Sequence, residues 1–558
     1  MVISMDNQKT GAQILIECLL EQKVDTVFGY PGGAVLNIYD ALYEYSDQIR
    51  HVLTAHEQGA AHAADGYARA TGRTGVVIAT SGPGATNLVT GIANAYMDSI
   101  PMVAITGNVA VDLLGRDSFQ EIDITGITMP ITKHNYIVKD IETLADIVRD
   151  AFVIANSGRK GPVLIDIPKD ITAKKTKYTK KEAAEKRKSL PPKEKKINLA
   201  LELIKQSKKP MIYAGGGVIS SECSRELVTF GERLQIPVAT SMMALGCIPA
   251  DHPLNLGMIG MHGTVHANLA AHKCDLLIVA GARFSDRVAT SRSNFAKHAK
   301  IIHIDIDYAE FDKNVVSSVH IAGDLKEVIA ELDKGLSPAD HSEWLTVIEG
   351  HRKPLKKVDH SDFPHPDFVI EKVNALCKDP IVVTDVGQHQ MWTAQYYPFQ
   401  SPRTFLTSGG LGTMGFGLGA AIGAQAGMPD RQVVLFSGDG SFHMNLHETT
   451  TLASYGFPVI VIIMNNSVLG MVRQWQKVFY GNRFSQTDPH RKTDFVALAK
   501  AFGIDGLRIE TPEDVEPVLK QAIALQKPVI IDCRISPDAN VLPMIPPGGS
   551  AEEIITEM

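Results

Sequence analysis

The segment VVLFSGDGSFHMN (433–445) decides the fold of this chain, together with VIVIIMNN (459–466), which comes after an interval long enough for a helix. Each segment begins as an unbroken apolar run of strand length. The first run ends at Asp439, which has a glycine on either side, and the second ends at paired asparagines, the later of which is Asn466. Runs that are apolar throughout and separated by helices are typical of parallel strands whose sheet is covered on both faces.

These two strand ends predict a binding site. The carboxyl ends of neighbouring parallel strands lie together, and ligands bind at that edge. The carboxylate of Asp439 and the amide oxygen of Asn466, 27 positions later, suit Mg2+, which usually shares its coordination shell with phosphates. Gly438 and Gly440 would let the backbone approach a diphosphate. Two ordinary turns are the alternative interpretation, but the pairing of GDG with NN favours a cofactor site.

Similar apolar runs recur along the chain and predict its organisation. They lie at 76–80, 102–106, 163–167, 211–215, 275–282, 301–306, 381–385 and 529–533. A basic stretch (173–196) and a polar, proline-containing stretch (335–366) interrupt the pattern and indicate solvated linkers. We therefore predict an α/β fold with three doubly wound parallel-sheet domains, at 1–172, 197–335 and 367–558. The basic stretch could also bind a polyanion, but no aromatic residues are interleaved in it, which favours a connector.

The composition excludes several classes of protein. Of the 558 residues, 44% are hydrophobic and 21% charged, which suffices for several cores and excludes disorder as the main state. The net charge of −7 argues against a protein that coats nucleic acid. Six cysteines without a CxxC pair exclude a disulfide framework and zinc-type spacing, and favour a reducing compartment.

The chain shows neither a secretory signal nor an apolar run long enough to span a membrane. We expect a soluble, cytoplasmic protein without nucleic-acid or membrane partners.

The two strand ends resemble the diphosphate-and-magnesium motif of thiamine diphosphate enzymes, and the similarity extends over nearly the whole chain. It is closest to the large, catalytic subunit of biosynthetic, FAD-containing acetohydroxyacid synthase (acetolactate synthase). Long blocks carry the resemblance in order: FGYPGGAVLNIYDAL, AHEQGAAHAADGYARATG, TSGPGATNLVTGIANA, QEIDITGIT, GPVLIDIPKDI, GMIGMHG, GARFSDRV, VGQHQMW, GGLGTMGFGLGAA, LGMVRQWQ and ANVLPMIPPGGS.

The resemblance implies an enzyme that joins two 2-keto acids. Pyruvate is decarboxylated on thiamine diphosphate, and the remaining two-carbon unit is ligated to pyruvate or 2-ketobutyrate. The products, 2-acetolactate and 2-aceto-2-hydroxybutyrate, belong to branched-chain amino acid biosynthesis. A catabolic acetolactate synthase or another thiamine diphosphate-dependent decarboxylase is the alternative enzyme. A non-catalytic regulatory homologue is the alternative of another class, and it would lack Glu57, Asp439 or Asn466, all of which are present.

The resemblance also implies an assembly. The three domains would be a pyrimidine-binding domain, a middle FAD-binding domain and a diphosphate-binding domain. In this family the cofactor lies between domains of different subunits, which implies a homodimer or tetramer. A separate small regulatory subunit is a further partner that the family suggests.

Glu57 resembles the family glutamate that bonds the aminopyrimidine ring of the cofactor, so that the imino nitrogen of the ring can take a proton from the thiazolium carbon. Met414 matches the residue that wedges under the cofactor, a role suited to a long unbranched side chain. Without the family, Glu57 would be an ordinary solvated carboxylate and Met414 a core residue. Further cofactor contacts are implied at Val386, Gln388, His389, Gly438, Asp439, Gly440, Ser441, Asn466 and Met471, with Asp439, Asn466 and the carbonyl of Val468 as magnesium ligands.

The family pocket around the reacting carbon matches residues in several blocks. Arg287 resembles the arginine that pairs with the carboxylate of the second keto acid, through two parallel hydrogen bonds. Trp475 resembles the tryptophan that favours 2-ketobutyrate as the acceptor. The other implied substrate-facing residues are Gly33, Ala34, Phe119, Gln120, Lys169 and Met261.

The middle domain is implied to bind FAD in a structural, non-redox role. Three glycines come after the strand at 211–215, but GxGxxG is not present, so the local signal is weak. The resemblance implies FAD contacts at Arg159, Gly216, Gly217, Met242, His262, Gly281, Arg283, Asp305 and Asp324.

The chain departs from the family pattern at a few positions. Ser285 stands where the family usually has Asp, and this puts local FAD affinity in doubt. His443 and His447 replace glutamines, and Ser467-Val468 replaces Gly-Tyr. None of these changes removes a catalytic group.

Overall fold

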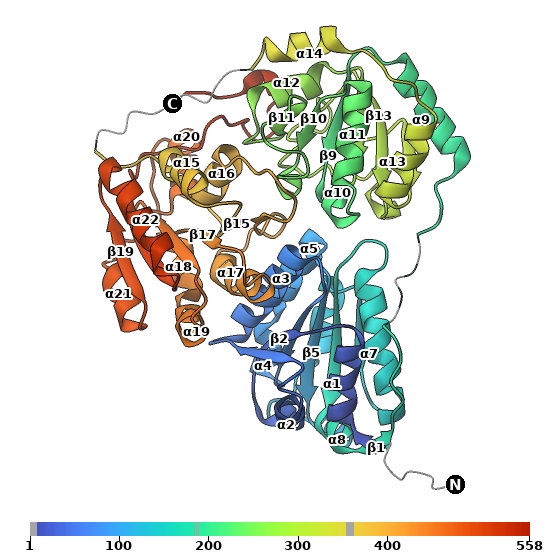
Figure 1. The fold of residues 1–558 in the computed structure, drawn as a ribbon, viewed down its shortest axis with the longest axis vertical. Helices are drawn as coiled ribbons and strands as arrows, with labels where there is room; N and C mark the ends of the chain where they lie inside the picture. Colours follow the sequence, from blue (N-terminus) through green and yellow to red (C-terminus); the bar gives the residue numbers. More distant parts are fainter. Residues whose placement is uncertain (1–7, 184, 186, 188, 353–361, 558) are drawn as a thin grey trace.

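Three parallel β-sheets of six strands each organise the chain (Figure 1). The computed structural model describes residues 8–183, 185, 187, 189–352 and 362–557. Every strand pair within the three sheets is parallel. The prediction of an α/β fold with three parallel-sheet domains is confirmed.

The N-terminal sheet has the strand order β3-β2-β4-β5-β7-β6. Successive residues of β4 point to opposite faces, and each face has its own core: Val77 packs with α3 and α5, and Val76 with α1 and α7. The strands are β2 (Thr26–Tyr30), β3 (Arg50–Leu53), β4 (Gly75–Ala79), β5 (Met102–Asn108), β6 (His134–Ile137) and β7 (Pro162–Pro168). The helices are α1 (Gly11–Glu21), α2 (Leu36–Glu44), α3 (Glu57–Thr71), α4 (Pro83–Asn87), α5 (Val89–Asp98), α6 (Ile124–Thr128), α7 (Ile141–Asn156) and α8 (Lys169–Ala173).

The middle sheet has the strand order β11-β10-β9-β12-β13-β14. Ile212 and Tyr213 of β9 enter two separate cores, so this sheet is also covered on both faces. The strands are β9 (Pro210–Ala214), β10 (Val238–Thr240), β11 (Asn255–Met258), β12 (Leu276–Ala280), β13 (Lys300–Asp305) and β14 (Val319–Ala322). The helices are α9 (Glu194–Gln206), α10 (Gly216–Ser220), α11 (Ser224–Leu234), α12 (Val265–Lys273), α13 (Leu325–Lys334) and α14 (Ser342–Glu349).

The C-terminal sheet has the strand order β16-β15-β17-β18-β20-β19. Its two faces are again buried, as Val461 and Ile462 of β18 illustrate. The strands are β15 (Ile381–Thr384), β16 (Phe405–Leu406), β17 (Val433–Gly438), β18 (Ile460–Asn465), β19 (Asp505–Ile509) and β20 (Val529–Arg534). The helices are α15 (Pro366–Leu376), α16 (Gln388–Tyr396), α17 (Phe416–Gly427), α18 (Asp439–Asn445), α19 (Thr449–Tyr455), α20 (Gly470–Phe479), α21 (Phe495–Ala501) and α22 (Val515–Leu525).

Helices α3 and α17 lie side by side and join the first and third sheets into one core (Figure 1). Both helices are rich in alanine and glycine, so their backbones come very close. A Cβ atom at Gly423 would overlap the carbonyl oxygen of Ala63, and one at Gly66 would overlap that of Ala420. Only glycine fits at these two crossing points.

The two stretches predicted as solvated linkers are only partly so. In the first, β8 (Lys175–Lys177) pairs antiparallel with β1 (Gln8–Thr10). In the second, helix α14 packs on the middle domain: Trp344 is 3% exposed, and its indole nitrogen donates to the carbonyl of Pro210 at 3.0 Å. Trp344 and Ile348, one turn apart, form an apolar face within a polar stretch, which composition alone does not reveal. Residues 353–361 of this stretch lie outside the described residues.

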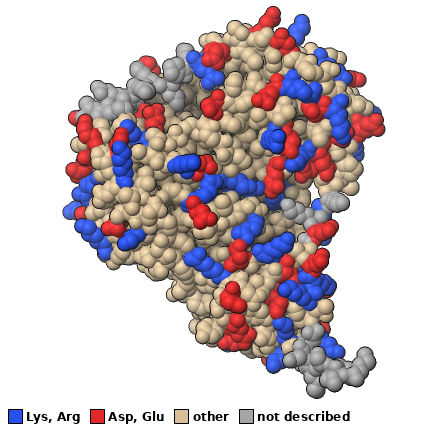
Figure 2. Space-filling view, viewed as in Figure 1, with Lys and Arg blue, Asp and Glu red and all other residues tan. Residues whose placement is uncertain are grey.

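Acidic and basic side chains are interspersed over the face shown in Figure 2. None of the described helices combines the length and apolar character that crossing a membrane requires. All six cysteines are buried and free, which confirms the prediction that no disulfide framework is present.

Candidate active site

The two strand ends predicted to bind a metal are neighbours in the third sheet. Gly438 of β17 pairs with Met464 of β18 in parallel register, so Asp439 and Asn466 both lie at the carboxyl edge. Asp439 is 4% exposed, and burial raises the pKa of its carboxyl to about 6. The charge of Arg491 acts in the opposite direction, but among the described residues no ion pair joins it to Asp439. A buried carboxylate that is not held in an ion pair suits a divalent ion.

Met414 reaches the same edge from the loop before α17. A Cβ atom at Gly440 would stand 3.8 Å from the methyl carbon of Met414 and 2.7 Å from Cδ2 of Leu469. The amide of Gly415 donates to Oδ1 of Asp385 at 2.8 Å and fixes the backbone directly after Met414. Leu469 and Asp385 were not predicted, although an acid at the end of the apolar run 381–385 was a usable signal.

His389 lies beside this edge on α16. Its Nδ1 atom would be 2.9 Å from a Cβ at Gly438, so the ring contacts the glycine backbone directly. Burial lowers the pKa of His389 to about 3, which keeps the ring neutral. Its Nε2 is buried and has no hydrogen-bond partner within the described residues. This nitrogen, the glycine backbone and the Asp439 carboxylate together fit a magnesium diphosphate group.

The paired asparagines have different partners. Asn465 donates to Oδ1 of Asp532 at 2.7 Å, whereas Asn466 donates to Oε1 of Gln388 at 3.2 Å. Gln388 also donates to Gln474 of α20 at 3.0 Å. The amide of Gln388 is therefore satisfied by the protein, and its visible role is to orient Asn466. Gln474 was not predicted.

The remaining residues predicted for this edge occupy the same turns. Ser441 accepts from the amide of Gly438 at 3.2 Å, and the amide of Val386 donates to Asp385 at 2.9 Å. Val468 is 6% exposed, and its amide donates to Oδ1 of Asn466 at 3.2 Å. Met471 is partly buried against the core of the third domain.

Glu57 is the first residue of α3. Its Oε2 accepts from Asn87 at 2.9 Å. The backbone just before it is fixed from the third domain: the amides of Ala55 and His56 donate to the Glu448 carboxylate at 3.2 and 3.0 Å. Glu448 is fully buried, and burial raises its pKa. Neither Asn87 nor Glu448 was predicted.

The predicted substrate-pocket residues of the first domain lie after strands at one sheet edge. Ala34 comes after β2, and its amide donates to Oγ1 of Thr80, which comes after β4, at 3.3 Å. A Cβ at Gly33 would meet no atom within 4 Å, so packing does not explain this glycine. Gln120 has a φ of +59°, and Phe119 is 88% exposed. Lys169 begins α8 after β7 and is exposed.

Arg287 and Trp475 are in contact although they come from different domains. The Arg287 guanidinium lies 5.9 Å from the centre of the Trp475 ring. The side chain is 63% exposed and pairs with neighbouring Asp286 at 3.5 Å. The amide of Met261 donates to the carbonyl of Arg287 at 2.7 Å. The structure therefore brings three predicted substrate-facing residues together at the junction of the middle domain and α20.

The predicted FAD residues gather mostly at the carboxyl edge of the middle sheet, but several have protein partners. The backbones of Gly217 and Gly281 touch, since a Cβ on Gly217 would lie 2.7 Å from Cα of Gly281. Arg159 pairs with Glu310 at 3.1 Å and with Asp307 at 3.5 Å. These contacts alone account for the residue types at those positions.

Three other predicted FAD residues also have structural roles. Arg283 donates to the carbonyl of Met97 at 2.8 Å. Asp305 accepts from the amide of Asp307 at 2.9 Å, and burial raises its pKa to about 6. Asp324 caps α13 by accepting from the amide of Lys326 at 2.9 Å.

The last three predicted FAD residues lie at the same edge of the middle sheet. Gly216 begins α10, and Met242 lies just after β10. His262 is buried, with its pKa lowered to about 4 by burial, and its Nδ1 lacks a partner within the described chain.

The residues that depart from the family pattern lie around these sites. His443 contacts the carbonyl of Asp439 and hydrogen-bonds Thr493 at 2.8 Å. The His447 ring is 5.5 Å from that of His56, next to Glu57. Ser467 has a φ of +60°, the conformation that suits the glycine of the family pattern. Ser285 lies in an exposed turn.

The structure thus forms three groups: one around Asp439, one around Glu57 and one around Arg287. Among the described residues no hydrogen bond or ion pair links Glu57 directly to Asp439 or Asn466. Glu448 of the third domain bonds the backbone directly before Glu57.

Comparison with protein families and with individual proteins gives the same result. Residues 9–127, 197–332 and 385–533 match the N-terminal TPP binding domain, the central domain and the C-terminal TPP binding domain of thiamine pyrophosphate enzymes. The chain is 48% identical to an acetolactate synthase of Mycobacterium leprae, over 98% of this chain and 90% of that protein. It is 47% identical to the acetolactate synthase large subunit of Corynebacterium glutamicum, over 98% and 90%. A probable acetolactate synthase large subunit of Methanocaldococcus jannaschii is 47% identical, over 98% and 95%. The chain therefore belongs to the acetolactate synthase family of thiamine diphosphate-dependent enzymes.

Proposed function

We propose that this chain is the catalytic subunit of a biosynthetic acetolactate synthase, which decarboxylates pyruvate and joins the two-carbon product to pyruvate or 2-ketobutyrate. The observation that carries the proposal is the contact of Arg287 with Trp475. Trp475 lies five residues after Gly470, the first residue of α20, and Gly470 abuts Asn466 at the metal edge. Five residues of helix span about 7.5 Å, so the guanidinium lies within reach of a small substrate at that edge.

Thiamine diphosphate, when bound, supplies the electron sink that decarboxylation of a 2-keto acid needs. The Asp439 carboxylate, Oδ1 of Asn466 and the carbonyl of Val468 would hold Mg2+ with the diphosphate. His389 would use its free Nε2 toward the same group. Met414 would support the rings from below. Burial of Asp439 favours a bound divalent cation, since an unpaired buried carboxylate is costly.

Glu57 is proposed to hydrogen-bond the pyrimidine ring of the cofactor and to exchange a proton with it. Asn87 occupies Oε2, so Oε1 is the atom available to the ring nitrogen. The backbone bonds from Ala55 and His56 to Glu448 hold the start of α3 in place and orient the carboxylate. Such preorganised acid–base groups contribute about 10²–10⁴-fold to the rate.

Arg287 is assigned to the carboxylate of the acceptor keto acid, because an exposed guanidinium can form two parallel hydrogen bonds with it. Trp475 would contact the extra methyl group of 2-ketobutyrate, an interaction that discriminates by roughly 1–3 kcal/mol. Gly33, Ala34, Phe119, Gln120, Lys169, Met261 and Met471 complete the proposed pocket.

FAD is proposed in a structural role at the carboxyl edge of the middle sheet. The unpartnered Nδ1 of His262 and the glycines that begin α10 support a ligand there. The proposed contacts are Arg159, Gly216, Gly217, Met242, His262, Gly281, Arg283, Asp305 and Asp324. Since Arg159 and Asp324 already have protein partners, we expect them to shape the site as much as to contact the ligand.

The proposal includes a homodimer or tetramer with shared active sites, as the resemblance to the family implies. Several relatives are named large subunits. We propose that a small regulatory subunit binds this chain. A titration with such a subunit that changes neither activity nor the response to valine would contradict this.

The test of the proposed function is to mix the purified chain with pyruvate, thiamine diphosphate and Mg2+, with and without FAD, and to measure acetolactate after acid conversion to acetoin. We expect FAD-dependent product. Glu57→Gln should lower the rate about 10²–10⁴-fold, whereas Glu44→Gln, at the exposed end of α2, should not. Product without FAD would indicate a catabolic acetolactate synthase, and CO2 with acetaldehyde would indicate a simple decarboxylase.

A further inference from the structure

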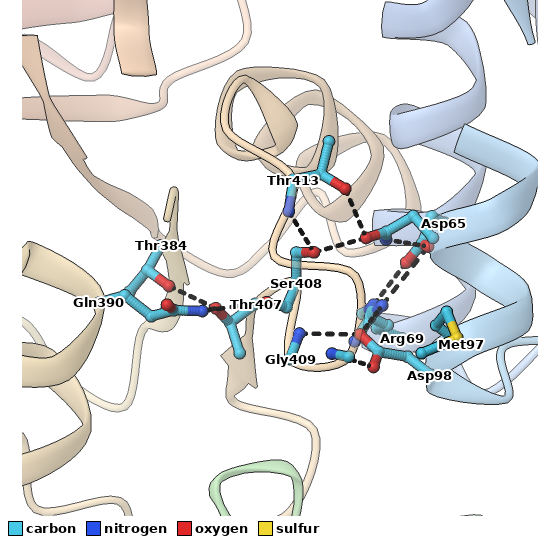
Figure 3. A network of polar contacts seen from close by, with 12 residues as sticks. Asp65, Arg69, Met97, Asp98, Thr384, Gln390, Thr407, Ser408, Gly409 and Thr413 are labelled. Carbon is cyan, nitrogen blue, oxygen red and sulfur yellow. Dashed lines mark hydrogen bonds and ion pairs between the residues drawn. The ribbon is translucent and has the colours of Figure 1, made fainter. Parts of the chain in front are cut away.

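The last turn of α5 lies where all three domains meet (Figure 3). The carbonyl of Met97 accepts from Arg283 of the middle domain at 2.8 Å. The carboxylate of the next residue, Asp98, accepts from the amides of Gly409 and Gly410 in the third domain, at 3.0 and 2.7 Å. A single turn of the first domain thus bonds both of the others.

The Asp98 side chain is fully buried and paired. Its Oδ2 accepts from Arg69 of α3 at 2.8 Å, and Arg69 also pairs with Asp65. Burial alone would lower the pKa of Arg69, but the two carboxylates outweigh it and raise the pKa, so the guanidinium stays charged. This cation stabilises the carboxylate that holds the two glycine amides.

A second contact holds the other end of the same loop. Ser408 and Thr413 donate to Oδ1 of Asn94 at 2.5 and 3.2 Å, and the amide of Thr413 donates to Ser408 at 2.9 Å (Figure 3). Asn94 is fully buried and is itself oriented by Asp65, to which it donates at 2.9 Å. Asp98 and Asn94 therefore hold both ends of residues 408–413.

This loop leads directly into Met414. It contains Gly409, Gly410 and Gly412, whose backbones are intrinsically free, and Leu411 at its tip is 42% exposed. Local preference therefore does not fix its path, and packing adds one close contact, since a Cβ at Gly409 would overlap Sδ of Met243 in the middle domain. The methyl carbon of Met414 nevertheless lies close to Gly440. The hydrogen bonds that define the path of this loop come from Asp98 and Asn94, together with Gln390, which donates to the carbonyl of Ser408 at 3.1 Å.

We propose that Asp98 and Asn94 are positioning residues, which place the 408–413 loop so that Met414 stands under the cofactor. This inference rests on the proposed function, in which Met414 supports thiamine diphosphate. Neither residue touches the cofactor, and their effect passes through the loop backbone. The bond from Arg283 to Met97 makes the same turn sensitive to the middle domain.

The test is the affinity for thiamine diphosphate with Mg2+, measured by titration calorimetry on the full-length chain. We expect Asp98→Asn and Met414→Ala each to weaken binding about tenfold. The double variant should bind about as weakly as either single variant, because both changes disable the same element. Asp25→Asn removes an exposed pairing with Arg73 in the same domain, which makes no contact with the loop among the described bonds, and should bind within about twofold of the unchanged chain.

If the affinity of the double variant falls about a hundredfold, the product of the two single losses, the inference is overturned. An unchanged affinity of Asp98→Asn would overturn it as well. If Asp98→Asn does not fold, Ser408→Ala is the second test. It removes the hydroxyl that donates to Asn94 and accepts from the amide of Thr413, and unchanged binding would overturn the inference. The proposed function fails in a separate experiment, when the unchanged chain binds thiamine diphosphate but makes no acetolactate.

Discussion

The contact between the first and third domains differs in kind from the contact that each makes with the middle domain. Helices α3 and α17 share a single apolar core, with alanine and glycine backbones in direct contact. The two cores of the middle domain are built from its own residues. It contacts the first domain through polar bonds such as those from Arg159 to Glu310 and from Arg283 to Met97, and it packs one apolar side chain, Leu245, against the core of the third domain. The two domains proposed to bind thiamine diphosphate thus share one core, whereas the proposed FAD domain keeps separate cores.

The largest effect is expected from breaking the shared core. Gly423→Ala places a methyl group against the carbonyl of Ala63, where no flexible atom can give way. We expect a loss of about 3 kcal/mol in the free energy of unfolding, measured from urea midpoints. Gly231→Ala in α11 is the matched control: its nearest atom would be 3.3 Å away, and it should change stability by less than about 1 kcal/mol. Equal effects would mean that the α3–α17 contact can relax.

The shared core should also be sensitive to acid through His62, whose ring packs on Phe416 at 5.4 Å. Burial lowers the pKa of His62 from 6.5 to about 3. The unfolded chain therefore takes up this proton first, and the stability present above pH 6.5 is lost as the pH falls. Between pH 7 and 5 the unchanged chain should lose about 2 kcal/mol that His62→Gln does not lose. His490→Gln, at an exposed site, is the control for the loss of a histidine.

The docking of the middle domain should respond to Glu310→Gln. Glu310 is 5% exposed and accepts from Arg159 and Lys313, both at 3.1 Å. Without this charge, separating the first domain from the middle domain should cost about 1.5 kcal/mol less free energy. Backbone hydrogen exchange should therefore be faster on both sides of their interface. Asp333→Asn, which breaks a pair with Arg233 within the middle domain, should affect only α11 and α13. Faster exchange on one side alone would mean that Arg159 does not join the domains.

The smallest effect concerns backbone strain at Ser467 in the third domain. Ser467 has a φ of +60°, which costs a residue with a side chain roughly 1–2 kcal/mol. Ser467→Gly should therefore raise stability by at most about 1 kcal/mol, since glycine also makes the unfolded chain more flexible. Thermal unfolding would measure this gain. Weaker Mg2+ binding in the variant would show instead that the serine shapes the metal edge.

Features that depend on strand periodicity could be predicted from the sequence. Parallel strands that end at Asp439 and Asn466 had to bring these residues to one edge, and the register of β17 with β18 does so. Contacts that depend on backbone atoms far along the chain left no such signal. Glu448 bonds amides 392 and 393 positions away, and nothing in the identities of Ala55 and His56 indicates this.

The same limit applies to the middle domain and the linkers. Ion pairs such as Arg159 with Glu310 depend on how the domains dock, which periodicity does not encode. Helix α14 was missed because its two buried residues, Trp344 and Ile348, stand in a stretch that is polar on either side of the helix. The roles of the individual site residues remain predictions that the experiments above can test.

The close contact of α3 with α17 has a consequence for an assembly with shared sites. In such an assembly, each chain would lend Glu57 to one cofactor and Met414 to another. Glu57 begins α3, and Met414 stands two residues before α17 begins. The shared core would then connect two active sites directly, so that a displacement at one cofactor would be transmitted to the other through packed backbone.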